Sequence, residues 1–179
     1  MTDVEGALVL DTGPLSHLAQ SGWLGVLRSV AGERQVVITD AVEAERRMGL
    51  PGRPHLQMVL DSDWIVVERL ESPSEISAFA DVAARLVVGD RNVGEASVLA
   101  YARVHRATAV VDDGAARTAA QEMRIARKGT LALLCDAIRG GLLTIDLVSD
   151  IADHLLATTY RLPFAPGGFE RWASEQGLV

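Results

Sequence analysis

The chain has 179 residues, of which 49% are hydrophobic and 23% charged, and its net charge is −7. This length and composition predict one folded domain with a sizeable core and exclude a disordered chain. The acidic balance argues against a general nucleic-acid coat protein, and the single cysteine, Cys135, excludes an intramolecular disulfide and a cysteine-rich zinc site.

Short apolar runs alternate with segments of helical periodicity along the chain, which indicates an α/β fold. The apolar runs predict strands over about residues 7–10, 36–38, 64–67 and 107–111, with a last short strand near residue 125. Helices are predicted to begin near Pro14, Leu24, Asp40, residue 54, Pro73, Val93, Ala115, Leu131 and residue 146, with a terminal helix around Trp172. Ser72-Pro73-Ser74-Glu75 is a strong helix start. The buried face of that helix is predicted to be Ile76, Phe79, Ala80, Ala83 and Leu86.

Two of the predicted strands end in acids. Asp11 directly follows ALVL, and Asp112 with Asp113 follows AVV. The carboxyl ends of parallel strands lie along one edge of a sheet, and neighbouring strands are about 4.8 Å apart. If these two strands are neighbours, Asp11 and Asp112 lie close enough to share a cation.

Two glutamates lie on predicted helices beside apolar residues. Glu45 follows Ala41 and Val42, and Glu95 precedes Val98 and Leu99 at helical spacing. A carboxylate on a core-facing stripe is costly unless it is paired or protonated. Each acid also has a purely structural interpretation, as a turn residue or in the capping pairs Asp40–Glu43 and Asn92–Glu95. Because capping does not require acids to line one cleft, the combination favours a shared site.

Five segments resemble, in order, the motifs of the PIN domain family of metal-dependent ribonucleases. They are VLDTGPLSHL, TDAVEAE, VGEASVLAYA, AVVDDGAARTAAQ and RKGTLALL, over about residues 7–140. The DTGPL and GEA motifs look most like a prokaryotic branch that includes relatives of the VapC toxins of type II toxin–antitoxin pairs. The resemblance implies a three-layer α/β/α fold with a mainly parallel sheet over residues 5–145. Residues 146–179 match no motif, and we expect a helical extension packed on the domain or on a partner.

The resemblance also implies the residues of the site. The implied catalytic acids are Asp11, Glu45, Glu95 and Asp112. The implied ligands of Mg²⁺ or Mn²⁺ are Asp11, Glu95, Asp112 and Asp113. The acid doublet leaves the principal fourth acid open, and we favour Asp112 because it directly follows the strand. For substrate binding we expect Thr12, through a hydrogen bond to an acid or a bound water, and Arg117, through a phosphate. The second motif departs from the family pattern at Asp40, where many relatives have proline.

We therefore expect a cytoplasmic endoribonuclease dependent on Mg²⁺ or Mn²⁺, the toxin of a type II pair. Its expected partners are an RNA substrate, a cognate antitoxin and a second copy in a homodimer. The acidic opening MTDVEG carries no basic segment, and no apolar run approaches the roughly 20 residues that span a bilayer. We expect the other basic residues after the second and fourth motifs to be solvated, and the four histidines to lie at the surface or boundary. Aromatic residues make up only 4% of the chain, so no base-stacking platform is expected.

Two other functions stay open at this stage. A non-catalytic PIN-like module that binds protein or RNA is compatible with the acidic charge and the unmatched tail. A phosphatase is disfavoured, because DTGPL lacks the second aspartate, two residues on, that an aspartyl-phosphate enzyme uses.

Overall fold

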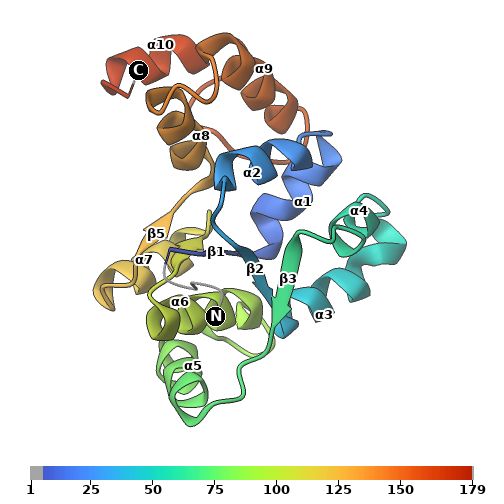
Figure 1. The fold of residues 1–179 in the computed structure, drawn as a ribbon, viewed down its shortest axis with the longest axis vertical. Coiled ribbons are helices and arrows are strands. Elements are labelled where there is room, and N and C mark those ends of the chain that lie inside the picture. Colours follow the sequence, from blue (N-terminus) through green and yellow to red (C-terminus); the bar gives the residue numbers. More distant parts are fainter. Residues whose placement is uncertain (1–5, 179) are drawn as a thin grey trace.

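In the computed structural model, residues 6–178 are described. The acidic opening and the predicted domain start at residue 5 lie outside the described residues. Within the described part, five strands form one sheet in which every pairing is parallel, in the order β3-β2-β1-β4-β5 (Figure 1). The strands are β1 (Leu8–Leu10), β2 (Val36–Thr39), β3 (Ile65–Glu68), β4 (Thr108–Val110) and β5 (Arg127–Lys128). The predicted strands are confirmed, although the last one begins two residues later than residue 125.

The central strand β1 is fully buried and marks the point where the strand order reverses. From β1 the chain continues outward to β2 and β3, and it then crosses to β4 on the other side of β1. Leu10 is paired with Val110 across the β1–β4 ladder. The two strands that end in acids are therefore neighbours, as the shared-site hypothesis required. In open parallel sheets, the crevice outside the carboxyl ends at such a reversal is where ligands bind.

Helices cover both faces of the sheet, which gives the expected three layers (Figure 1). On one face α6 contacts β1, β2 and β4, with α5 and α7 packed beside it. On the other face, apolar side chains of α1, α2 and α8 meet Leu10 and Val110. The α-helices are α1 (Thr12–Gln20), α2 (Leu24–Ala31), α3 (Asp40–Gly49), α4 (Leu56–Leu60), α5 (Pro73–Leu86), α6 (Val93–His105), α7 (Gly114–Glu122), α8 (Thr130–Arg139), α9 (Ile145–Leu156) and α10 (Phe169–Glu175). A 3-10 turn, η1 (Leu50–Gly52), follows α3.

Two predicted capping pairs are wrong. Thr39, and not Asp40, caps α3, because its hydroxyl accepts a hydrogen bond from the Val42 N–H. Asn92 has a left-handed backbone with φ 66°, and its amide donates to the Leu86 carbonyl, so it forms no side-chain cap with Glu95. The structural interpretation of Glu95 as the partner in a capping box therefore does not hold.

Two burial predictions are also wrong. On α5 the buried residues are Glu75, Ala78, Val82 and Leu86, so only Leu86 of the predicted face is fully buried, and Ile76 is exposed. Arg46 was expected in solvent, yet it is fully buried on α3 beneath the sheet edge. It lies four residues after the buried Val42, on the same helical face. Within residues 6–178 its guanidinium nitrogens have no hydrogen-bond partner, and burial lowers its pKa to about 10.

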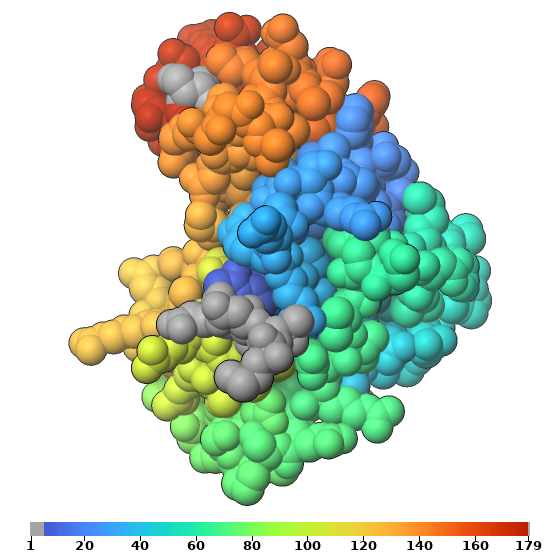
Figure 2. Space-filling model, viewed as in Figure 1, coloured from blue at the N-terminus to red at the C-terminus, as the bar shows by residue number. Residues whose placement is uncertain are grey.

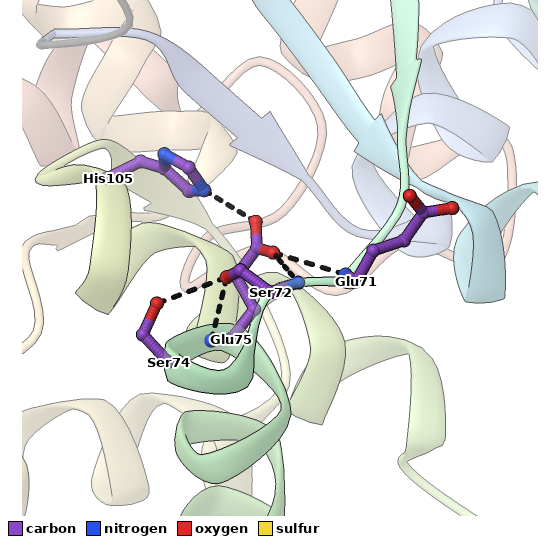
Figure 3. A network of polar contacts seen from close by, with 5 residues as sticks. All are labelled: Glu71, Ser72, Ser74, Glu75 and His105. Atoms are coloured by element: carbon purple, nitrogen blue, oxygen red, sulfur yellow. Dashed lines mark hydrogen bonds and ion pairs between the residues drawn. The ribbon is translucent and has the colours of Figure 1, made fainter.

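The start of α5 is fixed by the predicted capping box (Figure 3). The Glu75 N–H donates to the Ser72 hydroxyl, and Glu75 Oε2 accepts from the Ser72 N–H at 2.7 Å. The other oxygen, Oε1, lies 2.7 Å from His105 Nε2 at the end of α6. One buried carboxylate thus caps α5 and ties it to the far end of α6.

The C-terminal helices pack on the domain rather than extending from it. Figure 2 shows orange residues packed against the blue residues, with the red residues beyond the orange ones. Trp23 donates a 2.8 Å hydrogen bond to His154, and His17 lies 2.9 Å from the Thr158 hydroxyl. The cluster of buried side chains continues through α9 and α10, and it includes Cys135 on α8. None of the described helices is long and apolar enough to cross a bilayer.

Candidate active site

Asp11 and Asp112 lie side by side at the carboxyl edge of the sheet. The Asp11 N–H donates to the Val110 carbonyl at 3.2 Å, which continues the β1–β4 ladder past the last paired residues. The Asp11 carboxylate also caps α1, because Oδ2 accepts from the Gly13 N–H at 3.3 Å. Asp11 therefore caps α1 and also lines the cavity at this edge.

Glu45 is held at the same edge by two donors from different helices. The Thr12 hydroxyl at the start of α1 donates to Oε2 at 3.1 Å, and the Gly94 N–H at the start of α6 donates to Oε1 at 3.0 Å. A Cβ atom added to Gly94 would lie 2.7 Å from Oε1, so a side chain there would displace the carboxylate. The absence of a side chain at Gly94, the glycine of the GEA segment, therefore leaves space for the Glu45 carboxylate.

Asp112 is held by the Gly-Thr segment that follows β5. The Thr130 N–H donates to Oδ1 at 2.8 Å, and the Thr130 hydroxyl donates to Oδ2 at 2.7 Å. A Cβ atom added to Gly129 would come within 3.0 Å of Oδ1. Asp113 instead caps α7, because Oδ1 accepts from the Ala115 and Ala116 N–H groups.

One cavity of about 760 Å³ brings these side chains together. Its lining includes all five predicted acids and Thr12, namely Asp11, Thr12, Glu45, Glu95, Asp112 and Asp113. The remaining lining comes from α1, from residues 52–55 and from Thr159. There the Ser16 hydroxyl lies 3.1 Å from His55 Nε2, next to Arg53 and His17. Arg117 does not line this cavity; it lies in a neighbouring groove that Asp112 also lines.

The carboxylates oppose one another's ionisation. Burial, and then the negative charge of Glu95, raise the pKa of Asp11 to about 7. Burial also raises the pKa of Glu95, with the charges of Glu45 and Asp113 acting in the same direction. Asp11 is only 7% exposed, and its Oδ1 has no hydrogen-bond partner in the part of the chain that the structure describes. Such a cluster favours a cation or a proton.

The acids of the cavity suit a metal ion by their ligand chemistry, but they are not gathered into a coordination sphere. Carboxylate oxygens are the ligands that Mg²⁺ and Mn²⁺ prefer, and the orphaned Asp11 Oδ1 would gain a partner. Yet among residues 6–178 no three histidine, cysteine, aspartate or glutamate side chains are gathered closely enough to hold an ion. Mg²⁺ commonly keeps several waters and takes only one or two carboxylates directly. The residues present therefore fit a sparsely ligated magnesium ion.

The sequence did not predict that two histidines, His17 and His55, line the cavity. His17 and His55 are partly buried, as expected for boundary residues, but they line the cavity with the acids. A signal was present, since Gly13, Ser16, His17 and Gln20 recur at the spacing of one helical face, and all line the cavity. Thr159 and the neighbouring Tyr160 carried no local signal, because only the tertiary fold brings them to the acids.

Comparison with known proteins gives one match. The family model described as the PIN domain matches residues 7–165, which is most of the chain. No curated protein and no solved structure matches the chain. The matched span includes each of the acids that line the cavity.

Proposed function

The chain belongs to the PIN domain family, and on that premise we propose that it is an endoribonuclease dependent on Mg²⁺ or Mn²⁺. One observation carries the proposal: five acids from four separate segments of an α/β fold line one cavity, where two adjacent strands end in Asp11 and Asp112. Helix capping does not account for the whole set, because neither Glu45 nor Glu95 is an N-cap residue.

The chain's own residues would divide the work as follows. Asp11, Glu95, Asp112 and Asp113 would hold the cation directly or through water. Thr130 orients both oxygens of Asp112, and each oxygen keeps a second lone pair for a ligand. Thr12 and the Gly94 N–H keep Glu45 turned toward the cavity. The bound cation would acidify a water and neutralise charge on the phosphodiester during in-line displacement.

The direct test is RNA cleavage by the purified chain. We expect synthetic RNA to be cut with Mg²⁺ or Mn²⁺, and not with EDTA, and the activity to be lost in Asp11→Asn. Asp63→Asn, an exposed acid outside the cavity, is the matched control and should keep full activity. If the inhibitor-free wild-type chain cuts no RNA with either ion, the proposed activity is wrong.

We further propose that this nuclease is the toxin of a type II toxin–antitoxin pair, acting as a homodimer in the cytoplasm. Expression of the wild-type chain should then arrest growth, and Asp11→Asn should not. Co-expression of a small gene adjacent to its own should relieve the arrest, and its product should co-purify with the chain. A wild-type chain that is expressed without any growth defect contradicts the toxin role but leaves the nuclease activity testable in vitro.

A second candidate function is a non-catalytic PIN-like binding module. The observation that favours it is the lack, within residues 6–178, of a three-ligand metal cluster. Calorimetry separates the two functions. Mn²⁺ binding that is lost in Asp112→Asn supports the nuclease, whereas no binding together with unchanged stability of that variant supports the module.

A further inference from the structure

A second depression lies next to the acid-lined cavity. It is a groove of about 360 Å³, and Asp112 lines both the groove and the cavity. We call it the extension groove, because residues 160–163, Trp172 and Leu178 of the C-terminal segment form one side of it. The other side comes from Arg117 on α7 and from residues 129–139 of the α8 region. The C-terminal segment thus reaches the acids at the carboxyl edge of the sheet.

The extension groove is positively charged in a chain whose net charge is −7. Three arginines line it: Arg117, Arg139 and Arg161. Arg139 pairs with Asp136 at 2.9 Å and donates to the Leu178 carbonyl. Arg117 and Arg161 are exposed, and neither forms an ion pair with a carboxylate of residues 6–178. Two guanidinium groups therefore remain available for an anion beside Asp112.

The same groove contains aromatic rings, although aromatic residues make up only 4% of the chain. Four of the eight aromatic residues of the chain lie between residues 160 and 172. Trp172 packs with its ring centroid 5.3 Å from Phe164 and 6.4 Å from Phe169, and it also lines the groove with Tyr160. Neighbouring rings hold Trp172 in place, and the partly exposed side chain lines the groove.

The segment that carries Tyr160 and Arg161 is fastened to α1. The Thr158 hydroxyl lies 2.9 Å from His17 Nδ1 and accepts from the Tyr160 N–H at 3.1 Å. The Tyr160 ring meets the His17 ring edge-on, with centroids 5.0 Å apart. Tyr160 and Asp112 both line the groove, so this segment places an aromatic ring close to the acids.

We propose that the extension groove binds the single-stranded RNA that flanks the scissile phosphate, an inference that rests on the proposed nuclease function. Unpaired guanidinium groups suit phosphates, and aromatic side chains suit unstacked bases. A duplex keeps its bases stacked and offers none to Trp172 or Tyr160, so the combination selects single strands. Continuity through Asp112 places the bound strand against the acids.

Binding in EDTA tests the groove without requiring cleavage. We would measure fluorescence anisotropy of a labelled ten-nucleotide oligouridine and of an RNA duplex of equal length. Arg161→Glu should weaken single-strand binding about tenfold and reduce the salt slope by about 0.7, as expected for one lost phosphate contact. Arg171→Glu makes the same charge change on the same segment outside the groove, and it should change the affinity less than twofold.

Stacking is tested by substituting Trp172 in two ways. Trp172→Phe keeps a ring and should bind within about threefold of wild type, whereas Trp172→Leu should lose about tenfold, as expected when a base loses its stacking partner. If Trp172→Leu does not fold, the Arg161→Glu comparison decides the question alone, because Arg161 is exposed and has no packing role.

Three outcomes would overturn the inference. The first is an equal loss of RNA affinity in Arg161→Glu and Arg171→Glu, and the second is duplex binding as tight as single-strand binding. The third is displacement of the RNA by poly-glutamate at matched charge, which would assign the groove to an acidic protein segment. Groove-dependent binding without cleavage in Mg²⁺ or Mn²⁺ would instead refute the proposed nuclease and leave the RNA site standing. Cleavage by a chain whose RNA binding does not depend on the groove residues would support the nuclease and refute the RNA site in the groove.

Discussion

Thr130 donates to both oxygens of Asp112, from its N–H at 2.8 Å and from its hydroxyl at 2.7 Å. The pair joins the start of α8 to the end of β4, and Thr130 itself is buried. The two donors fix the plane of the carboxylate at the cavity. Thr130 is therefore a positioning residue for the acid that lines both the cavity and the extension groove.

Replacing the Thr130 hydroxyl tests this role. Thr130→Val keeps the backbone donor and the shape of the side chain but removes the second hydrogen bond, and it should lower metal affinity and activity about 10- to 100-fold. The free energy of unfolding should fall by about 1–3 kcal/mol, because a partly buried carboxylate oxygen loses its donor. Thr130→Ser restores the hydroxyl and should recover most of the activity. A Ser variant as impaired as the Val variant would contradict the hydrogen-bond role.

Gly94 allows a second test, because its missing side chain leaves space for Glu45. In Gly94→Ala the new Cβ would meet the Glu45 carboxyl atoms at 2.7–2.9 Å, so the carboxylate must move. A shift of about 1 Å in a catalytic group costs on the order of a hundredfold in rate. We expect that loss in an RNA cleavage assay.

Gly25→Ala is the matched control for Gly94. Gly25 also lies in a helix, but a Cβ there meets nothing within 4 Å. The change should stabilise the protein by roughly 1 kcal/mol through helix propensity and leave the activity unchanged. Wild-type activity in Gly94→Ala would show that the position of Glu45 does not matter.

The acids at the strand ends could be predicted because the rule behind them is general. The carboxyl ends of parallel strands share an edge, so residues such as Asp11 and Asp112 converge once their strands are neighbours. Local patterns likewise located the strands, the helices and the capping box of Glu75. These features depend on spacing within a few residues of the chain.

The predictions that were wrong or missing concern features set by tertiary structure, or residues that depart from the environment usual for their type. Arg46 follows Val42 by one helical turn, so the helical period places it on the buried face. The prediction of an exposed side chain rested on its charge alone. The predicted capping pair of Asn92 and Glu95 does not form, because the left-handed backbone of Asn92 directs its amide to the Leu86 carbonyl. Tyr160 follows Asp112 by 48 residues, and no local pattern announces that the two meet at one groove.

The capping network of Glu75 predicts a pH dependence of stability at the acid end. Although burial opposes its ionisation, hydrogen bonds from Ser72 and His105 lower the pKa of Glu75 to about 2. A lowered folded-state pKa adds stability that is present above the ordinary value of 4.5 and is lost as the pH falls toward 2. Urea denaturation should show Glu75→Gln about 0.5–2 kcal/mol less stable than wild type at pH 5, with the gap closing by pH 2.

Glu71→Gln is the control for that measurement. Its side chain points away from the network, whereas its N–H donates to Glu75 Oε2 (Figure 3). It should differ little from wild type at any pH. A gap between wild type and Glu75→Gln that stays constant down to pH 2 would contradict the lowered pKa.

Asp11 predicts the opposite dependence in the metal-free protein. Its pKa rises from 3.8 unfolded to about 7 folded, so the folded state holds the proton longer. The associated stability is complete below pH 3.8 and is lost as the pH rises through 7. In EDTA, Asp11→Asn should gain stability relative to wild type between pH 4 and pH 7, by at most about 4 kcal/mol. Urea denaturation across that range measures the difference.

Adding metal should reverse this order. Mn²⁺ at pH 7.5 should raise the melting temperature of wild type, because a ligand that binds only the native state stabilises it. It should leave Asp11→Asn unchanged, since that variant lacks the buried carboxylate oxygen without a partner. The Asp63→Asn control should respond like wild type. If wild type and Asp11→Asn differ by the same amount at every pH and gain equally from Mn²⁺, then Asp11 is a turn residue that caps α1 and has no part in a metal centre.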